Sequence, residues 1–555
     1  MDTQRLILAM IFFFSLFMLF EAWQRETRGP TPPVTAEKKA PDSAQAPPAS
    51  TPAPTTKLEP PTTAAITAPQ LPKQTSGAIV RVETDVFSIE IDSVGATITL
   101  VELKQHRGTV DTSKNFVLLE REPGRIYVAQ SGLIGEGLPN HNTRFVASAK
   151  EYKLGEGQKR LEVRFEAQGE EGAKVAKVFV FERGNYTIGV RHEIQNTTAT
   201  PVQPYAYYQV ARDGNPPEGD SKMMPTYTGI AVYTDKDKFQ KVAFDDIEKG
   251  KTSYTHTAAD GWIGLVQHYF VTAWIPPENA SREFFTRRLG DNLYSAGVIL
   301  PLGRIEPGAS ATQQVTLYAG PQDQDKLATI APGLDLTVDY GWLTVIAAPL
   351  FWVLKTVHRW VGNWGVAIIL LTVLIKLLFY PLSAASYKSM ARMRVLAPKM
   401  QRLKEQYGDD RQRMQQAMME LYKTEKINPL GGCLPILVQI PVFISLYWVL
   451  LASFELRQAP FMLWIKDLAA PDPYFILPVL MGATMIIQTR LNPEPPDPVQ
   501  AKIMKIMPIA FSVFFFFFPA GLVLYWLVNN ILSIAQQWHI TRSMEQHAAP
   551  THGRR

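Results

Sequence analysis

The sequence predicts a multi-span α-helical membrane protein, with one N-terminal anchor and five core helices, that carries a large β-sandwich domain outside the membrane. Two observations support this fold class. Apolar residues make up 46% of the 555-residue chain and are concentrated near the amino terminus and after Trp342. Residues 78–324 instead alternate between apolar and polar side chains, as half-buried strands do. The length of the chain exceeds that of one ordinary domain.

The amino terminus is predicted to be a membrane anchor followed by a tether. Residues 6–20 are apolar, follow Arg5 and lead into Glu21 without a small-residue cleavage site. We therefore expect residues 1–24 to form an uncleaved signal anchor whose amino terminus is cytoplasmic. Residues 25–77 are rich in Pro, Ala and Thr. Such a composition buries too little apolar surface to fold, which predicts an extended tether.

Residues 78–330 are predicted to form the β-sandwich as one domain. No long helical pattern interrupts this region, which favours an all-β architecture. The chain has a single cysteine, so the stability of this exported domain must come from its core and not from a disulfide. Strand patterns recur between turns rich in Gly, Asn and Pro, at residues 87–92, 97–101, 125–129, 161–167, 176–181, 186–194 and 313–319.

The sandwich sequence holds no motif that predicts an enzyme. It has no His/Cys group at metal-ligand spacing, no phosphate-binding loop and no Gly-x-Ser-x-Gly elbow. His268 stands beside Tyr269 in an aromatic-rich stretch, where a packed strand residue is the expected role. We therefore predict no catalytic residue, no cofactor and no metal.

The segment between the sandwich and the first core span is predicted to lie along the membrane surface. Residues 331–361 mix apolar residues with Trp342, Trp352 and Trp360 and end in basic residues. This composition is typical of an amphipathic helix in the interface plane. A plain connector between domain and membrane is compatible with the same pattern.

The first core span, residues 362–382, carries a cation inside its apolar stretch. Lys376 follows Thr372 by four residues, so both side chains project from one helix face. A cation at the centre of a span costs about 2.5–3.5 kcal/mol on insertion scales. Two interpretations remain open on these residues: the ammonium snorkels to the interface, or it lies in a functional polar groove.

Residues 383–427 are predicted to form a cytoplasmic helical hairpin. They hold ten Lys or Arg against five Asp or Glu, and so basic a short loop is expected inside the cell. Pro398 is expected to kink the first of its two helices. The basic face suits ribosomal RNA or anionic lipid, or serves only as a topology signal. The hairpin also contains six methionines, whose flexible side chains adapt either to varied apolar substrates or to packing between the two helices. They are Met390, Met393, Met400, Met414, Met418 and Met419.

Residues 428–540 are predicted to contain the other four core spans, near 433–452, 474–491, 504–518 and 522–537, before a short cytoplasmic tail at 541–555. The last two spans are shorter than the usual twenty or so residues, so a bilayer that meets them should thin locally. No acidic residue lies securely inside a core span, which counts against a proton relay or ion-coupled transporter. The possible polar or aromatic groove partners of Lys376 are Gln439, Thr484, Gln488, Tyr525, Trp526 and Asn530.

Several long motifs closely resemble the YidC family of membrane protein insertases. In the membrane half they are GNWG at 362–365, YPL at 380–382, NPLGGCLP at 428–435, ELRQAPF at 455–461, DPYFILPVLMG at 472–482 and FPAGLVLYW at 518–526. Two further stretches resemble the outer domain of the Gram-negative bacterial form, namely GWIGLVQHYFVTAWIP at 261–276 and LYAGPQ at 317–322. The motifs follow a fixed order and cover nearly the whole chain except the tether.

The resemblance implies an inner-membrane insertase with a periplasmic β-sandwich. In the family, five core helices enclose a hydrophilic groove open to the cytoplasm and to lipid, and a basic residue attracts acidic or polar parts of the substrate. Lys376 falls on that position, where many members carry Arg, and it keeps the charge without the bidentate fork. Thr372 and Trp526 fall on substrate-contacting positions. The resemblance also implies that the hairpin is required for insertion and that the sandwich, similar to sugar-mutarotase folds, has no catalytic role.

The expected function is therefore the movement of nascent transmembrane segments into the inner membrane, alone or with the Sec translocon, without enzymatic activity. The expected partners are nascent membrane proteins, the Sec translocon, membrane lipids, and the ribosome with its targeting factors, the last through a weaker contact because the tail is short. A channel or small-solute transporter that uses the same groove is the alternative. A periplasmic chaperone or scaffold, with the sandwich as its working part, is a second one.

Overall fold

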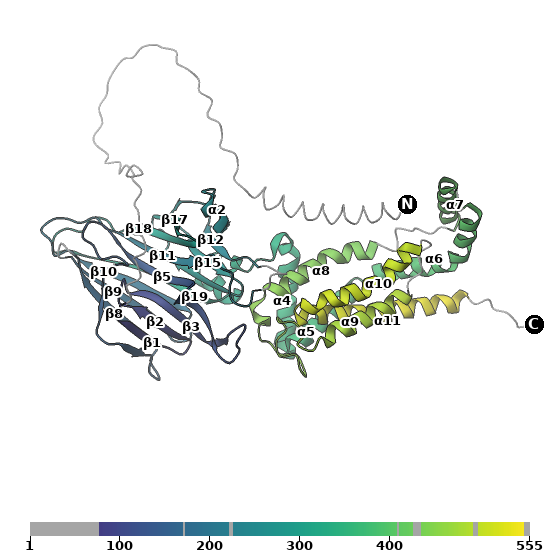
Figure 1. Ribbon diagram of the computed structural model, residues 1–555, viewed down its shortest axis with the longest axis horizontal. Coiled ribbons are helices and arrows are strands. Elements are labelled where there is room, and N and C mark those ends of the chain that lie inside the picture. The colour runs from purple at the N-terminus through teal and green to yellow at the C-terminus, as the bar shows by residue number, and fades with distance from the viewer. Residues whose placement is uncertain are drawn as a thin grey trace, which may run out of the picture. The chain divides into compact units, whose positions relative to one another are not determined.

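The computed structural model describes residues 77–169, 173–220, 226–407, 410–425, 434–491 and 498–548. The predicted anchor, nearly all of the tether, Cys433 and the end of the tail lie outside these ranges. The described residues divide into two compact units. We call the residues up to Pro321, together with Ala328–Leu334, the sandwich unit, and we call Gln322–Leu327 and the residues from Asp335 onward the helical unit. Figure 1 labels the elements of both.

The sandwich unit is built from two sheets, and the larger has ten strands. Neighbouring strands are antiparallel except for the pair formed by the two strands at one edge, β1 and β7. In spatial order the strands are β14 (Thr257–Ala258), β17 (Arg282–Gly290), β18 (Leu293–Pro301), β11 (Tyr205–Asp213), β5 (Arg125–Ile134), β4 (Asn115–Glu122), β3 (Thr97–Arg107), β2 (Phe87–Asp92), β1 (Ile79–Glu83) and β7 (Glu151–Lys153).

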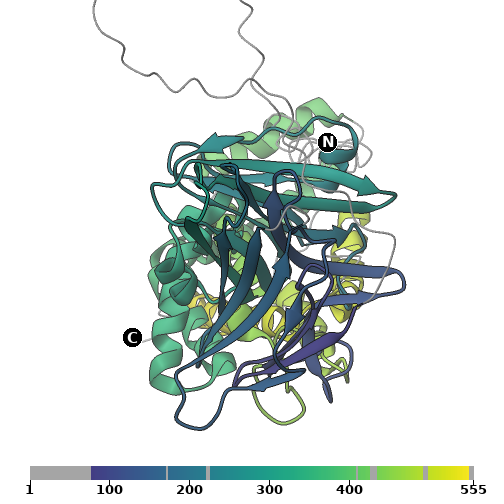
Figure 2. The same cartoon turned by 90° about the vertical axis from the view of Figure 1, so that its left-hand side faces the viewer.

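The second sheet has nine strands, all paired antiparallel. A short helix, α2 (Phe244–Glu248), follows one of its edge strands, and strands of the unit fill the foreground of Figure 2. In spatial order the strands are β13 (Lys238–Val242), β12 (Gly229–Thr234), β15 (Trp262–Gln267), β16 (Phe270–Ile275), β19 (Ser310–Pro321), β10 (Thr187–Gln195), β9 (Lys174–Glu182), β8 (Arg160–Gln168) and β6 (Val146–Ala147).

The alternation in the sequence forms these strands because one side chain in two faces the space between the sheets. In β10, Ile188, Val190, His192 and Ile194 are buried while the residues between them are partly exposed. All seven segments predicted to be strands fall on observed strands, with at most a one-residue shift, as at β10. The predicted β-sandwich is thus confirmed.

The expected place of His268 in a strand is wrong. His268 and Tyr269 form the turn between β15 and β16, whose end residues Gln267 and Phe270 pair with each other. Tyr269 has a φ of 69°, in the left-handed region that the second central residue of a type II turn adopts. The two rings of the turn stack with their centroids 3.7 Å apart. The turn was not predicted because its sequence, His268-Tyr269, lacks the Asn or Gly that usually indicates a hairpin turn.

The helical unit contains the helices that follow the sandwich in the chain. Its buried apolar core combines side chains from α4, α5, α8, α9 and α11, such as Leu354, Leu371, Leu446, Met481 and Val523. The helices are α4 (Thr344–Val361), α5 (Trp364–Leu378), α6 (Tyr380–Tyr407), α7 (Arg411–Thr424), α8 (Leu434–Ala452), α9 (Ile476–Leu491), α10 (Pro498–Phe514) and α11 (Ala520–Ala548). Short elements precede or connect them, namely α3 (Gln324–Ile330), η1 (Leu334–Thr337), η2 (Gly341–Leu343), η4 (Phe454–Leu456) and η5 (Phe515–Phe517).

The first predicted core span is interrupted before its end. The Asn363 side chain caps α5 by accepting from the Val366 amide at 3.1 Å, and α5 stops at Leu378. The chain then bends by 67° into α6, whose second residue is Pro381. Proline has no amide hydrogen to continue the ladder of α5 but is tolerated in a first turn. Residues 380–382 therefore open the next helix and do not close the span.

Length and composition single out few described helices as membrane spans. Gly341–Val361 is long and apolar enough by itself, and α5 with the first part of α6 qualifies only as a bent pair. Gln439–Ala452 and α9 are apolar but shorter. The last helix, α11, has 29 residues and continues well past residue 537, where its span was predicted to end. Residues 331–361 were expected to lie along the membrane surface. They contain the described helix that by itself is long and apolar enough to cross a membrane.

Candidate functional site

The predicted groove cation is held between two helices. Lys376 projects from α5, and its Nζ donates a 2.7 Å hydrogen bond to Oγ of Ser533 on α11. The hydroxyl of Ser533 in turn donates to the backbone carbonyl of Asn529, one turn earlier, also at 2.7 Å. Because the single hydroxyl hydrogen is used in this way, a lone pair of Ser533 is left to accept from the ammonium.

The same turn of α11 is joined to α8. Nε2 of Gln439 donates a 2.7 Å hydrogen bond to Oδ1 of Asn529. Tyr525, one turn further back on α11, is buried and also interacts with Gln439 through its side chain. We call Lys376, Gln439, Asn529 and Ser533 the polar cluster. It links α5, α8 and α11, which are far apart in the sequence.

Other predicted groove residues lie on a different side of α11. Asn530 is buried and its Nδ2 donates to Oγ1 of Thr484 on α9, at 3.4 Å. Gln488 follows Thr484 by one helical turn and is half-buried. Asn529 and Asn530 are consecutive, so their side chains point about 100° apart around the helix axis. The predicted partners therefore separate into a group toward α5 and α8 and a group toward α9.

The two remaining predicted positions of the helical unit are packed against apolar or backbone groups. Thr372 is 1% exposed, and its hydroxyl donates to the Ile368 carbonyl of its own helix at 2.7 Å. Trp526 packs edge-to-face on Phe443, with 4.4 Å between ring centroids, and lies 5.2 Å from the ring of Phe515. Thr372 shares the α5 face of Lys376 one turn away, as predicted from the spacing.

The methionines of the hairpin formed by α6 and α7 range from buried to exposed. Met400 is buried, and its sulfur accepts a 3.9 Å hydrogen bond from the hydroxyl of Tyr422 on the other helix. Lys399 and Glu425 join the same two helices by an ion pair of 2.7 Å. Met419, by contrast, is 59% exposed. The half-buried methionines are Met390, Met393, Met414 and Met418.

The sequence prediction did not include Asn529 or Ser533 among the site residues. A signal was present, because Ser533 follows Asn529 by four residues and Asn530 by three in the apolar first half of the last helix. Polar residues at these spacings share one helix face. What the sequence could not supply is the rotation of α11, which decides that this face meets Lys376.

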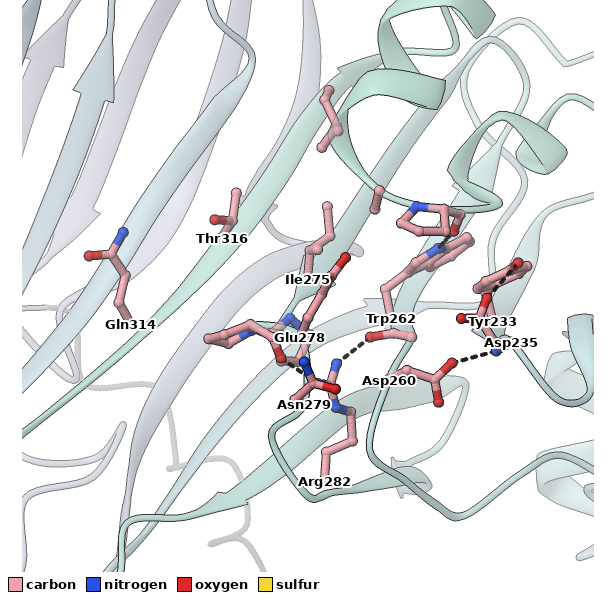
Figure 3. A pocket seen from close by; sticks show the side chains of 16 residues that line it. Tyr233, Asp235, Asp260, Trp262, Ile275, Glu278, Asn279, Arg282, Gln314 and Thr316 are labelled. Atoms are coloured by element: carbon pink, nitrogen blue, oxygen red, sulfur yellow. Dashed lines mark hydrogen bonds between the residues drawn. The ribbon is translucent and has the colours of Figure 1, made fainter.

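A cavity of about 500 Å³ lies within the sandwich unit and is drawn in Figure 3. Tyr233, Trp262, Ile275 and Ile330 give it apolar walls, while Asp260 and Glu278 lie at its polar side. The indole Nε1 of Trp262 donates to the Pro332 carbonyl at 3.0 Å. A cavity of this volume is within the range of small-ligand sites.

The positive charge at this cavity, that of Arg282, is bound to backbone carbonyls of the cavity wall. Arg282 is 2% exposed, and its guanidinium donates to the carbonyl oxygens of Ala259, Gly261 and Ala280 at 3.0, 2.6 and 2.9 Å, and to that of Pro277. Burial lowers the pKa of Arg282, and the charges of Asp260 and Glu278 oppose that shift. Within the described ranges no group of His, Cys, Asp and Glu could hold a metal ion.

The fold and this site together define a class of membrane protein that combines a large β-sandwich domain with a helical part in which a lysine side chain bridges two helices. Residues 79–353 match the family model of the YidC periplasmic domain, and residues 356–547 match that of the 60Kd inner membrane protein. The chain belongs to the YidC family of membrane protein insertases, which confirms the resemblance read from its motifs. It is therefore an inner membrane protein with a periplasmic domain, and its family is not one of enzymes.

Relatives that align over nearly their whole length support the assignment to the YidC family. The chain is 55% identical to the membrane protein insertase YidC of Nitrosospira multiformis, with 99% of each chain covered. It is 56% identical to that of Methylobacillus flagellatus, over 100% of this chain and 99% of the relative. A crystal structure of an active YidC insertase with its first transmembrane domain resolved aligns over 83% of this chain and 92% of its own, at 18% identity and a TM-score of 0.38.

Proposed function

We propose that this protein moves nascent transmembrane segments into the inner membrane through a hydrophilic groove whose cation is Lys376. The observation that carries the proposal is the environment of that ammonium group. Its hydrogen-bond acceptor is the neutral hydroxyl of Ser533, and among the described residues it forms no ion pair. A half-buried cation without a counter-ion attracts an acidic or polar segment that comes within a few ångströms.

The proposed arrangement in the membrane has one N-terminal anchor and five core helices. The anchor (1–24) and tether (25–77) precede the periplasmic sandwich (78–330), and residues 331–361 form a helix in the outer interface. The core consists of residues 362–382 and 428–540. The basic hairpin at 383–427 and both termini are cytoplasmic, by the excess of Lys and Arg in the hairpin.

The proposed mechanism begins at the hairpin. An apolar substrate segment contacts the exposed Met419 and the half-buried methionines of α6 and α7, whose thioethers adapt to varied shapes. The polar flank of the substrate then enters the groove at Lys376, with Gln439 and Tyr525 on the α8 side of α11. Thr484, Gln488 and Asn530 contribute polar contacts on the α9 side, and Thr372 and Trp526 contribute apolar surface. The apolar part leaves sideways into lipid. Burial of apolar surface, at about 25 cal/mol per Å², drives this step without nucleotide hydrolysis, and the membrane potential assists acidic flanks.

The proposed partners follow from this path. Nascent membrane proteins are the clients, which this protein inserts alone or with the Sec translocon. Ribosomes and targeting factors deliver the chains, with only a weak contact from the short tail. Anionic lipids suit the basic face of the hairpin, whose exposed cations include Lys388, Arg392 and Arg402.

Substitution of Lys376 tests the proposal. In cells depleted of the native insertase, Lys376→Ala should impair insertion of a substrate whose translocated segment carries two Asp, while Lys376→Arg should preserve it. Protease protection of the translocated segment measures insertion. Normal insertion by Lys376→Ala would refute a groove cation. Solute flux or conductance through liposomes that contain the purified protein, without insertion activity, would favour the channel or transporter instead.

A further inference from the structure

We infer that Ser533 is a positioning residue that fixes the ammonium group of Lys376 at its depth between α5 and α11, and thereby sets how strongly the site prefers acidic over neutral substrate segments. This inference rests on the proposed function. It adds a residue and a property, substrate charge selectivity, to the site.

The geometry gives Ser533 a single available role. The side chain is 4% exposed, and its hydroxyl hydrogen points to the Asn529 carbonyl. The lone pairs of Oγ are then directed away from that carbonyl, and Nζ of Lys376 lies 2.7 Å from the oxygen. A serine in a helix often bonds the carbonyl four residues earlier. Here that bond orients an acceptor for the cation.

A neutral acceptor suits a site that must attract acidic groups. An Asp or Glu at this position would neutralise the ammonium and compete with the substrate for it. The serine oxygen accepts a hydrogen bond but leaves the positive charge uncompensated. Lys376 is therefore held in place and remains an electrostatic target.

The acceptor is itself firmly placed. The turn of α11 that carries it is joined to α8, because Gln439 donates to Oδ1 of Asn529 at 2.7 Å. The Tyr387 side chain of α6 also interacts with the hydroxyl of Ser533. Three helices besides α11 thus converge on this turn through Lys376, Gln439 and Tyr387.

Lysine needs such a fixed partner more than arginine does. Its charge sits on a flexible four-carbon stem with no preorganised fork. Without an acceptor at this depth the stem is free to carry the ammonium toward water. The loss of Ser533 should therefore move the charge away from the path of the substrate while leaving the charge itself intact.

The test compares the full-length variants Ser533→Ala and Ser533→Thr in the depletion strain. The probes are two otherwise identical single-span substrates whose translocated segments carry either two Asp or two Asn. We expect Ser533→Ala to reduce the ratio of Asp-substrate to Asn-substrate insertion about tenfold, the size of a lost charge-assisted hydrogen bond. Ser533→Thr keeps a hydroxyl and should retain the ratio. Ser512→Ala is the matched control, because Ser512 on α10 also donates to a backbone carbonyl, that of Pro478 at 2.8 Å.

A double substitution separates positioning from a structural effect. If Ser533 acts through Lys376, Ser533→Ala should change nothing further in a Lys376→Met background. A loss of both substrates in equal proportion, or an added loss in the Lys376→Met background, would overturn the inference. If Lys376→Met itself leaves Asp-substrate insertion intact, the proposed function fails. If Lys376→Met impairs it but Ser533→Ala keeps the ratio, only the role of Ser533 fails.

Discussion

Nζ of Lys177 donates a 2.7 Å hydrogen bond to the Ser131 carbonyl and so joins the two sheets of the sandwich, because Lys177 lies on β9 and Ser131 on β5. A second bond, of 2.5 Å, goes to the Gly95 carbonyl. The side chain is fully buried and lies over the ring of Phe145 at 5.2 Å. The core of this exported domain therefore contains a lysine amine whose two hydrogen-bond acceptors are both uncharged backbone carbonyls.

The stability of the sandwich should rise with pH above neutrality. Burial lowers the pKa of Lys177 from 10.5 to about 7. Between these values the unfolded chain binds a proton that the folded chain does not, so stability increases as the pH rises from about 7 toward 10.5 and is constant below 7. The full window corresponds to about 3–5 kcal/mol. Thermal unfolding of the β-sheet circular dichroism signal at pH 7 and pH 9 measures the effect.

The variant Lys177→Met should remove this dependence. Methionine fills a similar volume without a titratable group, so its melting temperature should change much less between pH 7 and pH 9. Lys104→Met is the control, because Lys104 is on the surface and pairs with Glu83 at 3.0 Å. An equal pH response in the wild type and Lys177→Met would show that Lys177 does not titrate in this range.

Glu455 should make the helical unit less stable as the pH rises from about 4.5 to 7. It lies in η4, between α8 and α9, and both carboxylate oxygens are buried and have no hydrogen-bond partner among the described residues. Burial raises the pKa of this carboxyl to about 7 from 4.5, although the charge of Lys355 acts in the opposite direction. Between these values the folded state binds more protons than the unfolded state, so stability falls as the pH rises from about 4.5 to 7 and then stays low.

Glu455→Gln tests this relation. The amide keeps the shape and stays neutral, so the variant should be more stable than the wild type at pH 8, by about 1–3 kcal/mol, and nearly equal to it at pH 4.5. Protease resistance of the helical unit during a thermal ramp at each pH gives the comparison. The prediction would be contradicted if the variant were destabilised equally at both pH values, since that would indicate a lost polar contact and not a removed charge.

Thr372→Val should leave insertion within about twofold of the wild type, because the hydroxyl already bonds the Ile368 carbonyl of its own helix and is not available to a substrate. Valine is nearly the same size, so packing in the core is preserved. Insertion of the two-Asp substrate measures the effect, with Lys376→Met as the impaired reference. A defect as large as that of Lys376→Met would mean that the Thr372 hydroxyl turns toward the substrate during insertion.

Much of the fold could be predicted because it rests on local periodicity. Period-two alternation placed every predicted strand, and it also accounts for buried Lys177, which occupies the same inward face of β9 as Val175 and Phe179. Helix ends were less predictable. The end of α5 at Leu378 depends on how Pro381 enters the next helix, and the turn at His268 lacks the usual turn residues.

For the candidate site, the sequence by itself determined which residue carries the unusual charge. An apolar run of residues around Lys376 identifies a costly cation without reference to any other segment. Only the tertiary structure decided what that cation contacts. Ser533 is 157 residues away in the chain, and no local pattern encodes the rotation of α11 relative to α5. The physical reason is that secondary structure follows the spacing of side chains along one segment, whereas a polar contact between helices depends on how their apolar faces pack together.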